Sequence, residues 1–303
     1  MTTASPLRIG TRGSRLALAQ AEIAVAALAD AGAGGAAEVV PIRTRGDAIS
    51  ARRPSGGWVD GDGQFTRELE QALLDGRIDL VVHSFKDLPT APGDGLVIGA
   101  VLERGDARDC LITADGGSVD DLPFGARIGT SSPRRAAQLA ASRSDLIAVP
   151  IRGNVESRLQ RLRAGEFDAL ILAAAGLDRL GIGVASEARL PFELMLPAPA
   201  QGALALQCRS DDGALLAILA AVDHRPTRIA VEAERALLRH IGGGCLAPLG
   251  ALGEVDGATL RLRAAFEDRM GDLVRAAASG PLEDPSTIVE RVANEVMSAV
   301  ARS

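Results

Sequence analysis

Short apolar segments alternate with helical patterns through the first two thirds of this 303-residue chain. Apolar, β-branched runs predict strands at residues 7–11, 38–44, 80–84, 96–102, 127–130, 146–151 and 169–173. Helical spacing of apolar residues predicts helices at residues 14–31, 66–75, 133–142 and 155–164. Strand–helix alternation of this kind is typical of an α/β fold, with mostly parallel sheets and helices on both faces.

Several predicted helices have suitable residues at their ends. Ser132 and Pro133 place a hydroxyl at the N-cap and a proline at the first helical position. Asn154 is expected to cap the helix that begins at residue 155, and Thr66 the helix that Gly76 closes.

The last third of the chain has a different pattern. A helix is predicted at residues 225–241, strands at 247–253, 258–266 and 272–278, and a closing helix at 285–301. This order predicts a small α+β domain. The proline-rich residues 190–199 that precede it are interpreted as a crossing or hinge segment.

Composition excludes several classes of protein. A net charge of −6 and an aromatic content of 2% disfavour nucleic-acid binding, because both a basic surface and stacking platforms are lacking. No stretch approaches the roughly 20 apolar residues of a membrane span. The start of the chain has no secretory pattern, and no His/Cys cluster predicts a metal site.

The three cysteines, Cys110, Cys208 and Cys245, are odd in number and widely spaced. This argues against a disulfide framework and predicts a reducing, cytoplasmic environment. Cys110 and Cys208 lie in apolar runs and are expected to be buried. Cys245 follows three glycines, so it is either a buried structural residue or an exposed thiol that acts as a nucleophile.

Three arginine-containing groups, at residues 11–15, 131–135 and 152–158, each follow a predicted strand and open a helix. Ligands bind at the carboxyl ends of strands in open parallel sheets, and the first helical turn offers free N–H groups. The groups therefore predict a site for a ligand with several carboxylates or phosphates, although any single arginine can be an ordinary surface residue.

Lys86 and Asp87 come just after the apolar run at residues 80–84, and Lys86 is the one lysine of a chain with 33 basic residues. An aspartate at the end of a strand, beside cations, can move a proton or stabilise a positive charge. The alternative is a simple loop ion pair.

Residues 45–63 are rich in glycine, proline and charge, and are interpreted as a long surface loop that acts as a lid.

Seven motifs extend this pattern over almost the whole chain: TRGSRLALAQ (11–20), HSFKDLPT (83–90), GTSSPRRAAQL (129–139), IRGNVESRL (151–159), AAAGLDRLG (173–181), PAPAQGALALQCR (197–209) and GGGCLAPLG (242–250). Their order and spacing resemble those of the porphobilinogen deaminases. The resemblance implies two lobes like those of periplasmic binding proteins, arranged around a cleft, and a small α+β domain.

The implied boundaries are residues 1–102 with 201–221 for domain 1, 103–200 for domain 2, and 222–303 for domain 3. The implied reaction joins porphobilinogen molecules head to tail, releasing ammonia, and then frees hydroxymethylbilane by hydrolysis. A monomeric enzyme is expected, with a dipyrromethane cofactor held as a thioether by Cys245 of domain 3.

The resemblance also implies the site residues. Asp87 and Lys86 are the expected catalytic residues and also lie beside the cofactor. The other residues expected to bind the cofactor are Thr130, Ser131, Ser132, Arg134 and Arg135. Those expected to bind substrate are Arg12, Ser14, Arg152, Arg158, Arg179, Gln201 and Phe65.

One position departs from the family pattern: Asp62 stands where many relatives have a lysine at the end of the loop. Two alternatives stay open at this point. A non-enzymatic binding protein for an anionic ligand would share the two-lobed fold and the arginines. A relative without activity would keep the fold, although Lys86, Asp87 and Cys245 argue against that.

Overall fold

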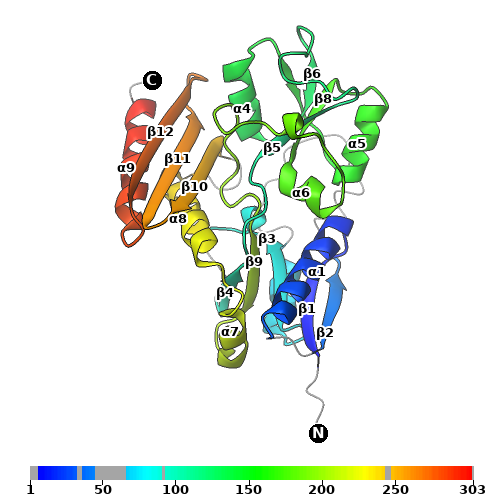
Figure 1. The fold of residues 1–303 in the computed structure, drawn as a ribbon, viewed down its shortest axis with the longest axis vertical. Helices are drawn as coiled ribbons and strands as arrows, with labels where there is room; N and C mark the ends of the chain where they lie inside the picture. The colour runs from blue at the N-terminus through cyan, green and yellow to red at the C-terminus, as the bar shows by residue number, and fades with distance from the viewer. Residues whose placement is uncertain (1–5, 33–35, 45–65, 91–92, 243–246, 302–303) are drawn as a thin grey trace. The chain divides into compact units, whose positions relative to one another are not determined.

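The computed structural model describes residues 6–32, 36–44, 66–90, 93–242 and 247–301. These residues fall into two compact units (Figure 1). The first unit contains the described residues up to Gly105 together with Ala203–Arg228, and the second contains Asp106–Gly202 together with the described residues from Ile229 onward.

The first unit is built on a five-stranded sheet in the order β2-β1-β3-β9-β4. β1 pairs in parallel with β2 and β3, whereas β9 is antiparallel to both β3 and β4. One strand, β9, therefore runs against the other four. The strands are β1 (Leu7–Arg12), β2 (Ala37–Ile42), β3 (Leu80–Ser84), β4 (Leu96–Val101) and β9 (Leu204–Arg209).

Helices cover both faces of this sheet. α1 (Arg15–Asp30) and α7 (Gly213–Leu219) pack in one apolar cluster with Leu80 and Val82. α3 (Arg67–Leu74) packs against Val81, which points to the opposite face because side chains alternate along a strand. The expected placement of helices on both faces of the sheet is confirmed.

The first part of the second unit repeats the plan around a four-stranded sheet in the order β5-β8-β6-β7. β6 is parallel to β7 and β8, and β5 is antiparallel to β8. Ile171 packs on one face with α4, and Leu170 packs on the other with α5 and α6. The elements are β5 (Asp109–Thr113), β6 (Arg127–Gly129), β7 (Ile147–Val149), β8 (Ala169–Ala173), α4 (Pro133–Ser142), α5 (Val155–Arg163) and α6 (Ala174–Arg179).

The chain ends in an antiparallel sheet, β10-β11-β12, whose one face is covered by two helices that share an apolar core (Figure 1). The close approach of α8 to β10 requires a glycine: a Cβ on Gly253 would lie 2.7 Å from the carbonyl oxygen of Ala230. The elements are α8 (Arg225–Ile241), β10 (Leu249–Asp256), β11 (Thr259–Glu267), β12 (Leu273–Pro281) and α9 (Pro285–Val300).

The predicted elements are observed to within a few residues at their ends, and the α/β class with mostly parallel sheets is confirmed. The predictions missed β5 and β9, which are the two reversed strands, and the short helices α6 and α7. The expected capping role of Thr66 is wrong: its backbone is helical and its side chain makes no capping hydrogen bond. Among the described helices, none has the length and apolarity to cross a bilayer.

Candidate active site

The candidate site residues of the first unit gather at the carboxyl ends of two neighbouring parallel strands. Arg12 ends β1, and Ser14 caps α1 by accepting a hydrogen bond from the Ala17 N–H at 3.2 Å. Beside it, β3 leads directly into the 3₁₀ turn η1 (Phe85–Asp87). Arg12 and Lys86 are half-buried and Asp87 is exposed. The sheet thus places the expected catalytic pair and Arg12 at one edge.

The turn that carries Lys86 and Asp87 is held in place on two sides. Gln20 of α1 donates from its side-chain amide to the Ser84 hydroxyl at 2.8 Å. The N–H of Phe85 donates to the carbonyl oxygen of Ala203 at 3.1 Å, and the Phe85 ring is buried. The backbone at Asp87 is therefore set by packed residues and not by its own exposed side chain.

A mostly buried chain of polar side chains links β3, β9 and α3. His83 Nε2 lies 2.9 Å from Gln207 Oε1 on β9, and the Gln207 amide nitrogen donates to Glu70 of α3 at 3.2 Å. Because the Gln207 oxygen faces the ring, His83 donates through Nε2. Burial lowers the pKa of His83 to about 4, although the bond to Gln207 opposes the shift.

This buried histidine predicts a loss of stability in weak acid. The folded protein keeps His83 neutral down to about pH 4, whereas the unfolded chain protonates near pH 6.5. The contribution of neutral His83 to the free energy of unfolding is therefore complete above pH 6.5. It is lost as the pH falls towards 4, by up to about 1.4 kcal/mol for each pH unit. Urea unfolding between pH 7.5 and 4.5, with His83→Gln as control, measures this change in the free energy of unfolding. A difference between the two proteins that does not change with pH would contradict the assignment.

In the second unit the candidate site residues again follow parallel strands. Ser131 and Ser132 come after β6, at the start of α4. The Ser131 hydroxyl donates to the Ile151 carbonyl oxygen at 2.7 Å and accepts from the Ile151 N–H at 2.9 Å, which joins the β6–α4 and β7–α5 connections. Ser132 accepts from the Arg135 N–H at 3.4 Å, as predicted for an N-cap, and its own N–H donates to Thr130 at 3.2 Å.

The β7–α5 connection positions Arg152 and Arg158. Asn154 caps α5 by accepting from the Ser157 N–H at 2.9 Å, which confirms the predicted cap. Gly153 has φ +110°, and a Cβ there would lie 2.2 Å from the Ser157 hydroxyl, so this tight turn requires glycine. Arg158 Nε donates to the Gly153 carbonyl oxygen at 2.9 Å.

Arg158 and Arg179 are half-buried cations that form no ion pair with a carboxylate among the described residues. Burial and the positive charges of Arg135 and Arg161 lower the pKa of Arg158 to about 10. Burial also lowers the pKa of Arg179 to about 10, and its guanidinium donates to the Gly202 carbonyl oxygen at 2.6 Å. Its acidic neighbour Asp178 pairs instead with Arg189. Both guanidiniums remain charged at neutral pH and favour an anionic ligand.

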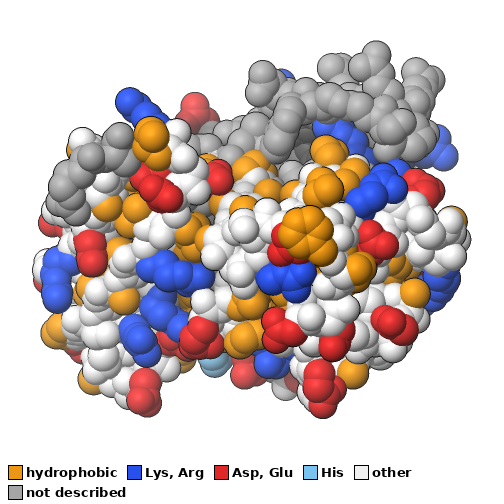
Figure 2. Space-filling model, turned by 90° about the horizontal axis from the view of Figure 1, so that it is seen from above, with side chains coloured by type: hydrophobic (Ala, Val, Ile, Leu, Met, Phe, Trp, Pro, Cys, Tyr) orange, Lys and Arg blue, Asp and Glu red, His pale blue; other side chains and the backbone are white. Residues whose placement is uncertain are grey.

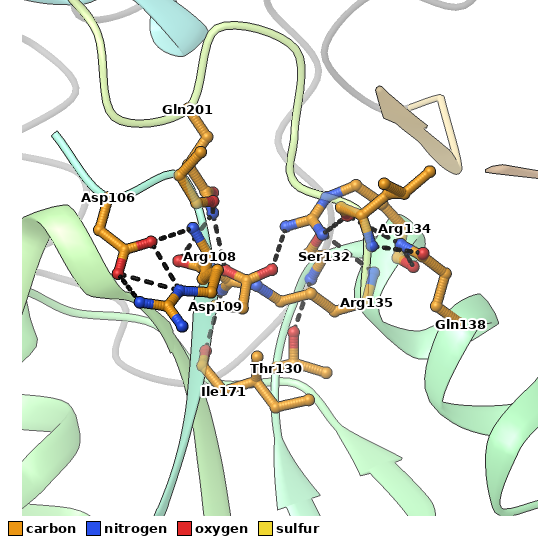
Figure 3. A network of polar contacts seen from close by, with 12 residues as sticks. Asp106, Arg108, Asp109, Thr130, Ser132, Arg134, Arg135, Gln138, Ile171 and Gln201 are labelled. Atoms are coloured by element: carbon orange, nitrogen blue, oxygen red, sulfur yellow. Dashed lines mark hydrogen bonds and ion pairs between the residues drawn. The ribbon is translucent and has the colours of Figure 1, made fainter. Parts of the chain in front are cut away.

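Arg134 and Arg135 have a different environment, which the sequence did not indicate (Figure 3). Both are buried and both pair with Asp109, the first residue of β5: Arg134 Nη2 lies 2.8 Å from Asp109 Oδ2, and Arg135 Nη2 lies 2.7 Å from Oδ1. Burial alone would raise the pKa of Asp109, but the two arginines hold it well below its usual range.

Asp109, the partner of both arginines, is a candidate site residue that the sequence analysis missed. Asp109 is the first residue of β5 and pairs with Ala173, the last residue of β8. Because β5 is antiparallel to β8, Asp109 lies at the same edge of the sheet as the two arginines. An acidic residue at the head of the apolar run that contains Cys110 was the signal available in the sequence. Gln201, expected to bind substrate, is also buried here, and its amide donates to Asp109 Oδ1 at 2.9 Å.

Some predicted site residues lie outside the described part of the chain: Cys245, Phe65, Asp62 and the loop at residues 45–63. Cys110 and Cys208 are buried, as expected. In the described ranges no group of His, Cys, Asp and Glu could hold a metal ion. On the face shown in Figure 2, basic and acidic side chains are interspersed.

Two family descriptions match this chain. "Porphobilinogen deaminase, dipyromethane cofactor binding domain" matches residues 7–217, and "Porphobilinogen deaminase, C-terminal domain" matches residues 228–298. Together they cover the connections at which the candidate residues lie.

Individual relatives agree with the family matches. A porphobilinogen deaminase of Desulforudis audaxviator is 48% identical over 92% of this chain and 90% of its own length. Those of Nocardia farcinica and Roseiflexus sp. are 47% and 43% identical over 99% and 98% of this chain, and 88% and 97% of their own lengths. Among solved structures, a putative methionine-binding lipoprotein from Bacillus subtilis is 13% identical, with a TM-score of 0.44 over 73% of this chain and 92% of that one.

Proposed function

The chain belongs to the porphobilinogen deaminase family, and from this membership we propose how its residues divide the work of the reaction. The chain joins four porphobilinogen molecules head to tail on a covalently bound dipyrromethane primer, releases ammonia at each addition, and frees hydroxymethylbilane by hydrolysis. The match of both family domains carries this conclusion and disfavours a non-enzymatic binding protein.

The residues of the second unit fit the primer. When bound, the dipyrromethane supplies the pyrrole carbon to which the first substrate is joined, and each of its rings carries an acetate and a propionate. Arg134 and Arg135 share one carboxylate, Asp109, and the Nε atom of each is buried without a hydrogen-bond partner. Orphaned donors with surplus positive charge suit an additional carboxylate. The two arginines would hold the primer, beside the Thr130, Ser131 and Ser132 connection.

We assign substrate and product carboxylates to five residues. For Arg158 and Arg179, the support is that no ion pair joins either one to a carboxylate among the described residues, although Asp178 acts electrostatically on Arg179. Arg12, Ser14 and Arg152 are assigned from their place at strand ends and from the family motifs. Gln201 is better suited to support Asp109 than to contact substrate, because its amide is buried and already bonded.

Asp87 is assigned the proton chemistry. An exposed carboxylate on a fixed turn can assist departure of the protonated amine, stabilise the cation that is left on the substrate, and take the proton from the ring carbon that has attacked. Lys86 beside it would attract the substrate carboxylates. Cys245 would attach the primer through its sulfur.

We further propose three domains with boundaries at residues 1–102 with 201–221, 103–200 and 222–303. The separate apolar core shared by α8, α9 and β10–β12 supports the last of them. We also propose a monomer in the cytoplasm. The buried free thiols of Cys110 and Cys208 support a reducing environment.

Covalent growth on the primer predicts a ladder of protein masses. With limiting porphobilinogen, intact mass spectrometry should show species separated by one porphobilinogen less one ammonia. Arg12→Leu, Arg152→Leu, Arg158→Leu and Arg179→Leu should each accumulate a particular rung, because different cations meet the chain at different lengths. Arg77→Leu, at an exposed ion pair with Asp75, is a matched control and should leave the ladder unchanged.

A single protein mass at every ratio of substrate to enzyme would contradict the covalent mechanism. A ladder that is unchanged in all four variants would leave the mechanism in place and remove the proposed roles of these arginines.

A further inference from the structure

Asp109 lies at the centre of a buried polar network in the second unit (Figure 3). Its side chain is 0% exposed, and its two oxygens face different arginines. Arg135 makes a hydrogen bond to Oδ1, whereas Arg134 faces Oδ2 at ion-pair distance but out of line for a hydrogen bond. Each arginine is also tied to a backbone carbonyl oxygen, Arg134 to that of Leu196 and Arg135 to that of Ile171.

The two guanidiniums that contact Asp109 share this one carboxylate. At this point of the network, one negative charge faces two positive charges in a buried site. Without Asp109, two like charges would lie close together out of water, and mutual repulsion would drive the side chains apart. Asp109 therefore sets both the spacing of the pair and the charge that is left for a ligand.

Asp109 is itself oriented by Gln201. The Gln201 amide donates to Asp109 Oδ1 at 2.9 Å and to the Ala107 carbonyl oxygen at 2.8 Å. The preceding residue, Ala200, has φ +63°, a left-handed conformation that is costly for a residue with a side chain. Its N–H donates to the buried carboxylate of Glu234 at 2.6 Å, which supports this conformation.

Glu234 extends the network to the elements on either side of Cys245 in the sequence. It belongs to α8, which ends at Ile241, and its second oxygen accepts from the Gly253 N–H of β10 at 2.7 Å. The chain of contacts thus runs from Gly253 through Glu234 and Ala200–Gln201 to Asp109 and its two arginines. Every contact in it lies within the second unit.

We propose that Asp109 is a positioning residue that holds Arg134 and Arg135 at a fixed spacing with capacity for one carboxylate of the primer, and that Gln201 orients it. The proposal rests on the proposed role of the two arginines in holding the primer. It predicts that loss of Asp109 impairs assembly of the primer on Cys245 before it affects any later step.

The test measures primer assembly by mass. Apo-protein is incubated with porphobilinogen, and intact mass spectrometry follows the appearance of polypeptide that carries the primer. The variants are Asp109→Asn, Asp109→Glu and Gln201→Leu. Asp106→Asn is the matched control. Asp106 lies three positions before Asp109, but its ion pairs are with Arg108 and Arg189 and not with Arg134 or Arg135. Circular dichroism and thermal melting record folding.

Loss of a charge-assisted contact should slow assembly about tenfold or more in Asp109→Asn, with partial recovery in Asp109→Glu. Gln201→Leu keeps both ion pairs and should slow assembly by about tenfold, because it removes a hydrogen bond to the charged Asp109 carboxylate. Asp106→Asn should assemble the primer at the parent rate. A purely structural role would lower the melting temperature of Asp109→Asn and leave the assembly rate of the folded protein unchanged.

The proposal is overturned if folded Asp109→Asn assembles the primer at the parent rate, or if Asp106→Asn slows assembly equally. If Asp109→Asn does not fold, the Gln201→Leu variant tests the proposal instead. Assembly of the primer at the parent rate in Gln201→Leu then overturns the proposal. Arg135→Leu separates this failure from that of the underlying role. If Arg135→Leu assembles the primer at the parent rate, the two arginines do not hold the primer. If Arg135→Leu assembles the primer slowly but Asp109→Asn assembles it at the parent rate, only the positioning role of Asp109 is wrong.

Discussion

The Cys245→Ala protein should fold, carry no dipyrromethane and show no activity, because the proposed thioether at Cys245 is what attaches the primer to the polypeptide. The other two cysteines are poor nucleophiles: burial raises the pKa of Cys110 and of Cys208 to about 11, so both are neutral thiols at pH 7. Intact mass and the colour reaction with acidic Ehrlich's reagent, which reports a bound dipyrromethane, both measure this result.

Cys110→Ala and Cys208→Ala are the matched controls. Each removes a buried sulfur from a strand, β5 or β9, and should cost some stability because it leaves a small cavity. Both proteins should keep the mass of the primer and the colour. Retention of the primer by Cys245→Ala would disprove the assignment.

Asp87→Asn should lower kcat by about a hundredfold or more while the primer stays attached, since general acid–base assistance is worth roughly 10²–10⁴-fold. Asparagine keeps the size of the side chain and its hydrogen bonding but cannot move a proton or balance a cation. The fold should be unaffected, because the backbone at this position is held by Gln20–Ser84 and Phe85–Ala203 contacts and the Asp87 side chain is exposed.

Asp94→Asn is the control for this substitution, because Asp94 is also exposed and belongs to the same unit. It should keep kcat within about twofold of the parent, as expected for an exposed residue outside the site. Steady-state rates, corrected for the fraction of protein that carries the primer, give the comparison. An Asp87→Asn enzyme within a few-fold of the parent would remove the catalytic role of Asp87.

The reversed strands show where local sequence patterns are insufficient. β1, β3 and β8 were predicted because each is a short apolar run, and this signal lies within a few residues. β5 and β9 have similar apolar runs, but their antiparallel partners, β8 and β3, lie far along the chain. Strand direction depends on the sheet that receives the strand, so no local signal reports it.

The candidate site divides in the same way. The helix starts at Ser14, Ser132 and Asn154 follow from capping chemistry, and the resulting placement of Arg12, Arg134 and Arg152 where strands give way to helices was predictable. The sequence also indicated that Asp87 follows a buried strand. What it did not indicate was the partner of each charge, and a buried pair such as Arg135–Asp109 looks like two separate surface residues.

Capping, turn geometry and apolar spacing involve neighbours in the chain, so the sequence of this protein specifies them directly. The pairing of Asp109 with Arg134 and Arg135, and of Gln201 with Asp109, joins residues 25 to 92 positions apart. Such contacts form only when β5 has packed against β8 and the residue 197–202 segment has closed over them. Burial then removes water as a competing partner, and this gives the folded site a fixed charge and geometry that the unfolded chain does not have.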